Sequence, residues 1–139
     1  MLDIAQALYE THKLTSYPRS DCQYLPEAEH ANAKAVLSAA FGNYGAEKWA
    51  AAFPGKANLA LKSGAWNDKK LGAHYGIIPT TQRVPVTSLS TNEAEVYGMI
   101  VRRYLAQFHS EYEYDSTSVA VQVGQDAFQA TGQAEVNLG

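Results

Sequence analysis

Three stretches in the first part of this chain of 139 residues carry the spacing and the end signals of helices. The predicted helices cover residues 2–12, 26–41 and 45–53. In the first of them, Ile4 and Leu8 lie four positions apart, which places them on one helical face. The second opens at Pro26, a favoured first-turn residue, and is predicted to stop at Gly42 because glycine commonly ends helices.

A more regular helical pattern follows a long irregular stretch. Residues 55–90 show little periodicity, and a stretch of that length inside a compact domain is often functional. Ser90 and Glu93 then have the spacing of a capping box, which predicts a helix near residues 91–110. Its apolar face is predicted to hold Val96, Ile100, Tyr104 and Phe108, with Val101 and Leu105 beside them.

Extended structure is predicted in two places. Residues 14–17 are β-prone but short, and Pro18 interrupts them. From Tyr112 onward apolar and polar residues alternate, and the turn that begins at Gly124 predicts a β-hairpin. Two strands alone are marginally stable, so we expect this hairpin to belong to a larger sheet or to pack on the helices. The predicted fold class is therefore α+β, mostly helical, with a C-terminal hairpin.

Composition indicates a globular chain and excludes several functional classes. Hydrophobic residues make up 46% and charged residues 18%, which is not the composition of a disordered chain. No apolar run has the length of a membrane span, so no membrane partner is expected. Cys22 is the only cysteine, which excludes an internal disulfide and favours a reducing, intracellular location. No set of metal ligands has a recognisable spacing.

Charge is distributed unevenly along the chain. The net charge is −3, yet residues 54–89 hold five Lys or Arg and a single acid, Asp68. Residues 1–53 and 90–139 both carry more acids than bases. A local basic patch can meet a phosphate backbone even when the total charge is negative. On charge alone, an ordinary solvated lysine-rich loop is an equally good interpretation.

The segment that carries chemistry is Leu14-Thr15-Ser16-Tyr17-Pro18-Arg19-Ser20-Asp21. It resembles the active-site signature of type IA DNA topoisomerases, and its form resembles the topoisomerase III branch of that family. Further segments resemble the same family in the same order, and these are residues 4–10, 22–26, 73–80, 114–117 and 128–132. The resemblance is collinear over nearly the whole chain, which makes it a strong signal.

The resemblance implies that Tyr17 attacks a backbone phosphorus of single-stranded DNA and forms a 5′-phosphotyrosine, so that rejoining needs no ATP. A free phenol has a pKa of about 10 and is a poor nucleophile until a nearby group helps to remove its proton. Positions i and i+2 of an extended stretch point to one side, so Arg19 could reach the attacked phosphate. His74 resembles the family histidine near the break, and it could donate a hydrogen bond to a phosphate or move a proton.

The predicted nucleic-acid-binding residues are Arg19, Ser20, Lys69, His74, Thr80 and Gln82. The hydroxyl and amide groups in this set have an alternative role, because such groups in loops commonly satisfy local backbone atoms. Asp21 could orient Arg19 or cap a turn, and both roles remain open. The tyrosines interpreted as core or rim aromatics, rather than as base-stacking platforms, are Tyr9, Tyr24 and Tyr97.

The resemblance also implies a domain organisation. Residues 1–111 would be the active-site tyrosine domain, with a winged-helix or helix-turn-helix-like fold, and residues 112–139 would be strands of the adjoining arch domain. The family's Mg2+ site and a glutamate that works beside the tyrosine lie in a separate N-terminal domain, and nothing in this chain matches them. We therefore expect an excised fragment that binds no metal itself and is close to inert in relaxation.

The expected partners are single-stranded DNA and the remaining domains of the parent topoisomerase, with no small-molecule substrate. The expected location is the cytoplasm of a bacterium, in association with the nucleoid. The alternative function is a non-catalytic module of the same fold that binds single-stranded nucleic acid.

Overall fold

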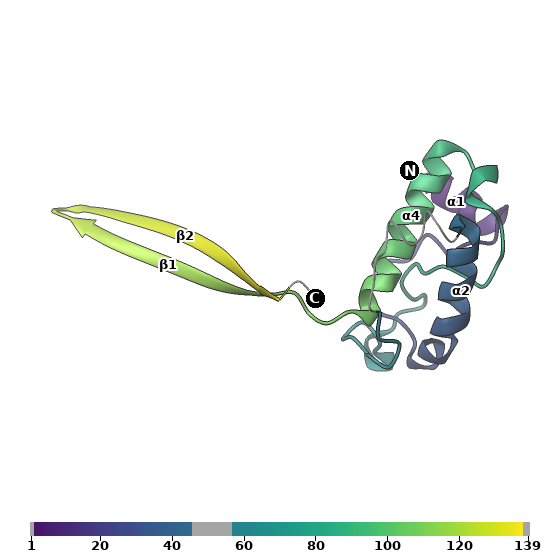
Figure 1. Cartoon of the computed structure of the whole chain (residues 1–139), viewed down its shortest axis with the longest axis horizontal. Coiled ribbons are helices and arrows are strands. Elements are labelled where there is room, and N and C mark those ends of the chain that lie inside the picture. The colour runs from purple at the N-terminus through teal and green to yellow at the C-terminus, as the bar shows by residue number, and fades with distance from the viewer. Residues whose placement is uncertain (1, 46–56, 138–139) are drawn as a thin grey trace. The chain divides into compact units, whose positions relative to one another are not determined.

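The structure is a computed structural model, and it describes residues 2–45 and 57–137. The chain divides into two compact units, Met1–His109 and Ser110–Gly139. The first unit contains α1 (Leu2–Glu10), α2 (Ala33–Tyr44) and α4 (Thr91–Leu105), and the second contains β1 (Glu113–Val123) and β2 (Asp126–Asn137) (Figure 1). The 3-10 turns are Glu27–Asn32, Asp68–Lys70, Val86–Ser88 and Ala106–Phe108. The α+β fold class is confirmed, while the winged-helix description stays a prediction.

Helix α2 begins later and ends later than its sequence pattern predicted. The predicted start forms a 3-10 turn, Glu27–Asn32, and the α-helix then runs through Gly42 to Tyr44. The prediction that Gly42 stops the helix is wrong, because a glycine inside a helix costs only about 1 kcal/mol relative to alanine. Gly45 ends the helix instead, with a φ of 78° that glycine adopts without a Cβ clash. Beyond Gly45, the predicted helix over 45–53 lies outside the described residues.

Helix α4 has the predicted capping box. The Ser90 hydroxyl accepts a hydrogen bond from the backbone N–H of Glu93, and the Glu93 carboxylate accepts one from the N–H of Ser90. Its buried stripe differs from the predicted one, because Tyr97 is fully buried whereas Val96 and Ile100 are only partly so. Helices α1 and α2 both pack against α4, so the stripe they cover extends to the Tyr97 side.

Aromatic side chains from the end of α4, the turn after it and the loop over residues 57–70 form a cluster in the core. The Tyr104 and Phe108 rings meet edge to face with their centroids 5.4 Å apart, and Trp66 lies 5.8 Å from Phe108. Edge-to-face pairs of this kind add to the free energy gained by burial alone. The irregular loop is therefore held by packing rather than by regular secondary structure.

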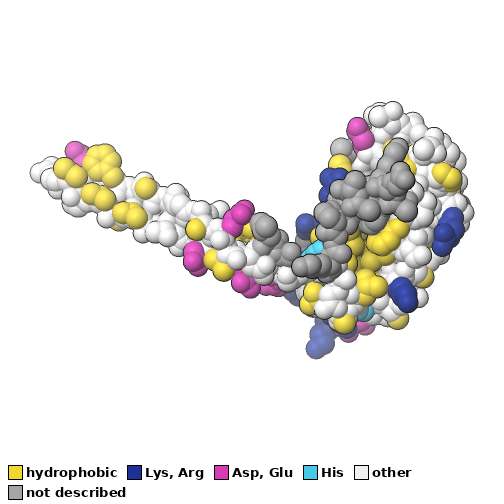
Figure 2. Space-filling view, in the orientation of Figure 1, with side chains coloured by type: hydrophobic (Ala, Val, Ile, Leu, Met, Phe, Trp, Pro, Cys, Tyr) yellow, Lys and Arg dark blue, Asp and Glu magenta, His cyan; other side chains and the backbone are white. Residues whose placement is uncertain are grey.

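The two strands pair antiparallel, with Val121 opposite Phe128 and Val119 opposite Ala130, and the register shifts once, between Glu113 and Tyr114. All described hairpin side chains are exposed, and Val121 and Phe128 keep 48% and 59% of their surface accessible. Figure 2 shows apolar side chains gathered near the turn of the hairpin. The β-hairpin predicted after Tyr112 is confirmed, although both of its faces are exposed and the returning strand extends well beyond the predicted Thr131. No helix in the described part of the chain is both long and apolar enough to cross a membrane.

Candidate active site

Two distant segments of the chain pair beside the predicted nucleophile. The backbone N–H of Ser16 donates to the Ile78 carbonyl at 2.9 Å, and that of Thr80 donates to the Leu14 carbonyl at 3.0 Å. Thr15 and Pro79 form the single antiparallel bridge between these hydrogen bonds. The residues predicted to be extended, 14–17, therefore form one bridge rather than a strand. This pairing places the segment that carries Tyr17 next to the segment that carries His74.

The Tyr17 and His74 rings lie against one another. Their centroids are 4.5 Å apart and their planes are inclined by 37°. Tyr9 of α1 meets the Tyr17 ring edge to face at 5.6 Å. Tyr17 is half-buried and His74 is exposed, so both rings remain within reach of a bound strand. Sequence reasoning proposed Tyr17 and His74 separately, and the structure brings them together.

Ser16 fixes the backbone directly before Tyr17. Its hydroxyl donates to the Gly76 carbonyl at 3.2 Å and accepts from the Ile78 N–H at 2.9 Å. One side chain thus bridges two backbone groups of the segment that follows His74. Sequence reasoning gave Ser16 no role of its own, because a hydroxyl in a motif carries no signal of a partner so distant in the chain.

Arg19 is exposed, and the described residues provide no ion pair or hydrogen bond to its guanidinium. Asp21 is also exposed and does not pair with Arg19 within the described part of the chain, so the orienting role considered for Asp21 has no support here. An exposed guanidinium two residues from Tyr17 is available for a phosphate. Pro18 between them is buried, which anchors the backbone that carries both side chains.

The other residues predicted to contact DNA either bond to nearby backbone groups or are simply exposed. The Thr80 hydroxyl donates to the Lys13 carbonyl at 2.6 Å and accepts from the Gln82 N–H, so it already satisfies backbone groups. The Ser20 hydroxyl accepts from the Cys22 N–H in the same local manner. Gln82 and Lys69 are exposed, and no contact among the described residues joins Lys69 to Tyr17. Their DNA contacts stay predictions, and Lys56 of the basic segment lies outside the described residues.

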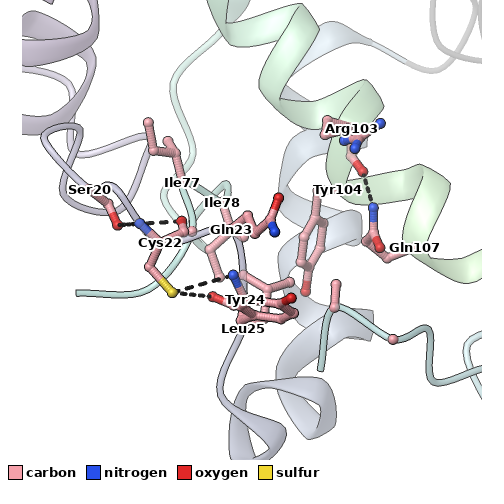
Figure 3. A pocket seen from close by; sticks show the side chains of 13 residues that line it. Ser20, Cys22, Gln23, Tyr24, Leu25, Ile77, Ile78, Arg103, Tyr104 and Gln107 are labelled. Carbon is pink, nitrogen blue, oxygen red and sulfur yellow. Dashed lines mark hydrogen bonds between the residues drawn. The ribbon is translucent and has the colours of Figure 1, made fainter. Parts of the chain in front are cut away.

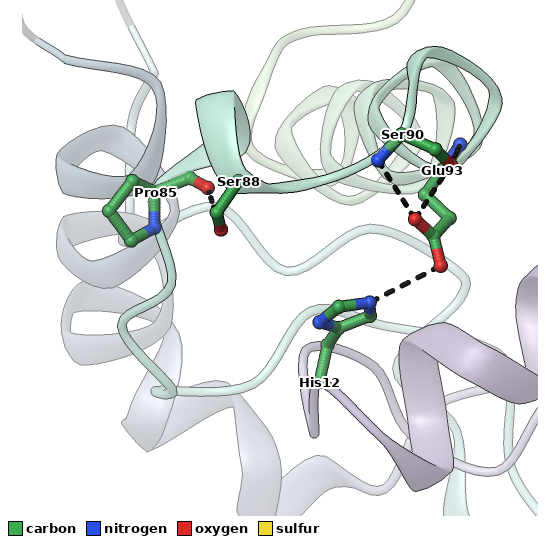
Figure 4. A network of polar contacts seen from close by, with 5 residues as sticks. All are labelled: His12, Pro85, Ser88, Ser90 and Glu93. Carbon is green, nitrogen blue, oxygen red and sulfur yellow. Dashed lines mark hydrogen bonds and ion pairs between the residues drawn. The ribbon is translucent and has the colours of Figure 1, made fainter.

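A polar network joins the end of α1 to the start of α4 (Figure 4). His12 Nε2 lies 3.2 Å from a Glu93 carboxylate oxygen, and the other oxygen of Glu93 accepts from the Ser90 N–H and hydroxyl. The Ser90 hydrogen bonds are the main cause that lowers the pKa of Glu93, with His12 a smaller one. The network therefore joins the end of α1, the helix that precedes the Tyr17 segment, to the start of α4.

A pocket of about 450 Å³ opens beside the loop that follows Tyr17 (Figure 3). No acidic side chain lines this pocket. Its lining residues are Ser20, residues 22–25, Gly64, Ala65, residues 76–78, Arg103 and Tyr104 of α4, and Gln107 of the 3-10 turn that follows α4. The buried Tyr104 hydroxyl has no hydrogen-bond partner within the described part of the chain. Burial raises the pKa of Tyr104 to about 12, so this hydroxyl stays protonated at neutral pH.

The described residues do not fit a Mg2+ site, because they bring no three His, Cys, Asp or Glu side chains together. Magnesium prefers oxygen ligands in a near-octahedral arrangement.

Comparison with known proteins identifies the family of the chain. A model of the DNA topoisomerase family matches residues 1–139, the whole chain. Proteins named DNA topoisomerase 3 from Vibrio cholerae and Pasteurella multocida are 41% and 40% identical over 100% and 92% of the chain, and one from Bacillus subtilis is 31% identical over 99%. The chain spans about a fifth of these relatives, 19–21% of their length. The chain therefore belongs to the type IA DNA topoisomerase family, in its topoisomerase III branch.

Proposed function

We propose that Tyr17 is the nucleophile with which the whole protein transiently cleaves and rejoins single-stranded DNA. The observation that carries this proposal is the contact between the Tyr17 and His74 rings, centroid to centroid 4.5 Å, created by the pairing of two distant segments. In the step proposed, the Tyr17 oxygen bonds to phosphorus while the bond from phosphorus to the 3′ oxygen breaks. The phenol loses a proton and the leaving 3′ oxygen gains one, so atoms and charge balance.

Two neighbours assist this step. Arg19 binds the attacked phosphate through its exposed guanidinium, whose planar fork matches the geometry of phosphate oxygens. His74 donates a hydrogen bond to a phosphate oxygen from its position against the Tyr17 ring. Rejoining is the reverse reaction, in which the 3′ oxygen attacks the 5′-phosphotyrosine. The bond energy is kept throughout, so strand passage requires no ATP.

The remaining parts of the parent protein are proposed to complete the site. Mg2+, held there, would offset negative charge on the DNA phosphates. Positioning of several partners can be worth many powers of ten in rate, so we expect this chain alone to be nearly inert in relaxation. The bacterial relatives support a cytoplasmic location, at the nucleoid.

The test combines this chain with the separately expressed remainder of the parent protein, Mg2+ and labelled single-stranded DNA. Tyr17→Phe is expected to abolish cleavage, whereas Tyr24→Phe, a matched loss of a hydroxyl elsewhere, keeps it. Size-exclusion chromatography first establishes that the two parts associate. Binding of the oligonucleotide by an associated pair that never cleaves it would refute the nucleophile and favour the non-catalytic binding module.

A further inference from the structure

Lys13 occupies a backbone conformation that side chains other than glycine rarely adopt. Its φ is 57°, and it is the only residue other than glycine with a positive φ in the described part of the chain. A left-handed conformation is strained for an L-residue, because its Cβ comes too close to the following carbonyl oxygen. The position also has a structural reason, because Lys13 lies three residues after the end of α1 at Glu10, where the chain changes direction.

The chain turns back onto α1 at this point. The Leu14 N–H donates to the Leu8 carbonyl at 2.8 Å, and both leucines are fully buried. The residue between them that takes the left-handed conformation is usually glycine. Here it is a lysine, so the preference for glycine in this conformation is not met at a position four residues before the proposed nucleophile. Broken local rules of this kind concentrate at functional sites.

The Lys13 side chain has no acidic partner among the described residues, and it is exposed. Its ammonium lies 5.8 Å from the centre of the Tyr9 ring, and that ring in turn meets Tyr17 at 5.6 Å. The Lys13 carbonyl accepts from Thr80, so its backbone is clamped to the segment that pairs beside Tyr17. A solvated cation is therefore held close to the proposed nucleophile without an ion pair that neutralises it.

We propose that Lys13 binds a phosphate of the single-stranded DNA next to the phosphate that Tyr17 attacks. The inference rests on the proposed function and adds one residue to its binding surface. The Tyr9 ring lies between the Lys13 ammonium and the Tyr17 ring. Because successive phosphates of a strand are at least about 3.4 Å apart, the ammonium matches the phosphate next to the attacked one better than the attacked phosphate itself. A compact ammonium suits such a backbone contact, which needs charge but no fixed geometry.

The proposal predicts that stability and DNA binding change in opposite directions in one variant. Lys13→Gly removes the left-handed strain and the charge together, so its melting temperature should rise by about 2–4 °C while its affinity for an oligothymidylate falls about threefold to tenfold. Lys13→Arg keeps the charge and should bind like the wild type. Lys34→Gln removes the charge of an exposed lysine on α2 and serves as the control.

The measurement is fluorescence anisotropy of a labelled oligothymidylate with the full chain, at several salt concentrations. Loss of one phosphate contact lowers the slope of log affinity against log salt by about 0.7 for a single strand. We expect that change for Lys13→Gly but not for Lys34→Gln. Equal slopes and affinities for Lys13→Gly and the wild type would overturn the inference and leave Lys13 a packing partner of Tyr9. Absence of binding by the wild type would instead count against DNA binding by this chain, and the inference would fall with it.

Discussion

The centroids of the Tyr17 and His74 rings lie 4.5 Å apart. The hydroxyl of Ser16, the residue before Tyr17, forms hydrogen bonds with the backbone of Gly76 and Ile78. The contact between the two rings is thus built by backbone pairing rather than by the two side chains alone. Its consequence is that one substitution can remove the imidazole without releasing the tyrosine.

His74→Ala should therefore slow formation of the covalent DNA adduct while leaving the fold intact. A hydrogen bond to a charged group contributes about 1.5–3 kcal/mol, which corresponds to about 10- to 100-fold in rate. The check is single-turnover cleavage in the reconstituted protein, with His109→Ala as the histidine control. An unchanged rate in His74→Ala would mean that the imidazole packs on Tyr17 and does nothing more.

Asn43→Ala should strongly destabilise the first unit. The buried Asn43 amide donates to the Gln82 carbonyl and the Tyr97 hydroxyl, and its oxygen accepts from the Val84 N–H. Removing it leaves buried polar groups unsatisfied, at a cost of about 2–4 kcal/mol. Denaturant unfolding of the full chain measures this loss, and Asn92→Ala on the exposed face of α4 should change stability by less than about 0.5 kcal/mol.

Glu93→Gln should remove a pH-dependent part of the stability. The pKa of Glu93 is lowered in the folded state, chiefly by Ser90, so the folded state is stabilised by the ionised carboxylate. That contribution is fully present above the ordinary pKa of 4.5 and is lost as the pH falls through the lower folded value. We expect the wild type to exceed Glu93→Gln by about 0.3–1 kcal/mol at pH 7 and by almost nothing in strong acid.

The control for this effect is Glu95→Gln, an exposed carboxylate on the same helix that lacks the Ser90 contact. Thermal unfolding from pH 3 to pH 7 compares the three proteins. A stability difference for Glu93→Gln that stays constant over that range would contradict the capping role of the charge.

Val121→Thr combined with Phe128→Thr should reduce self-association of the isolated chain. These residues face one another across the hairpin and are both exposed, and an uncovered apolar sheet face is prone to association. Threonine keeps a high strand propensity while removing apolar surface. Light scattering at increasing protein concentration gives the readout, with Ser118→Thr as the control on the other face. Equal scattering by the double variant and the wild type would show that this apolar pair does not mediate contact.

Elements with local signals were predictable from the sequence. The capping box at Ser90 and Glu93 and the hairpin after Tyr112 depend only on neighbours in the chain, and both are confirmed. The end of α2 was predicted wrongly, because Gly42 and Gly45 are equally plausible stops until the backbone angle at Gly45 is known.

The site was predictable as a set of residues but not as an arrangement. Tyr17 and His74 were identified through motifs, whereas their contact depends on a bridge between Thr15 and Pro79 that no local pattern encodes. The sequence did not single out Ser16, because its hydrogen-bond partners are distant in the chain. It did not single out Lys13, because the unusual feature of that residue is its backbone conformation.

The most direct test of the central claim is to locate the DNA end that becomes attached to Tyr17. An oligonucleotide labelled at its 3′ end, and a second labelled at its 5′ end, are each cleaved by the reconstituted protein and denatured before peptide mapping. Only the 3′ label should stay on the protein, on the peptide that contains Tyr17, as a 5′-phosphotyrosine requires. Retention of the 5′ label, or an adduct that persists in Tyr17→Phe, would contradict it.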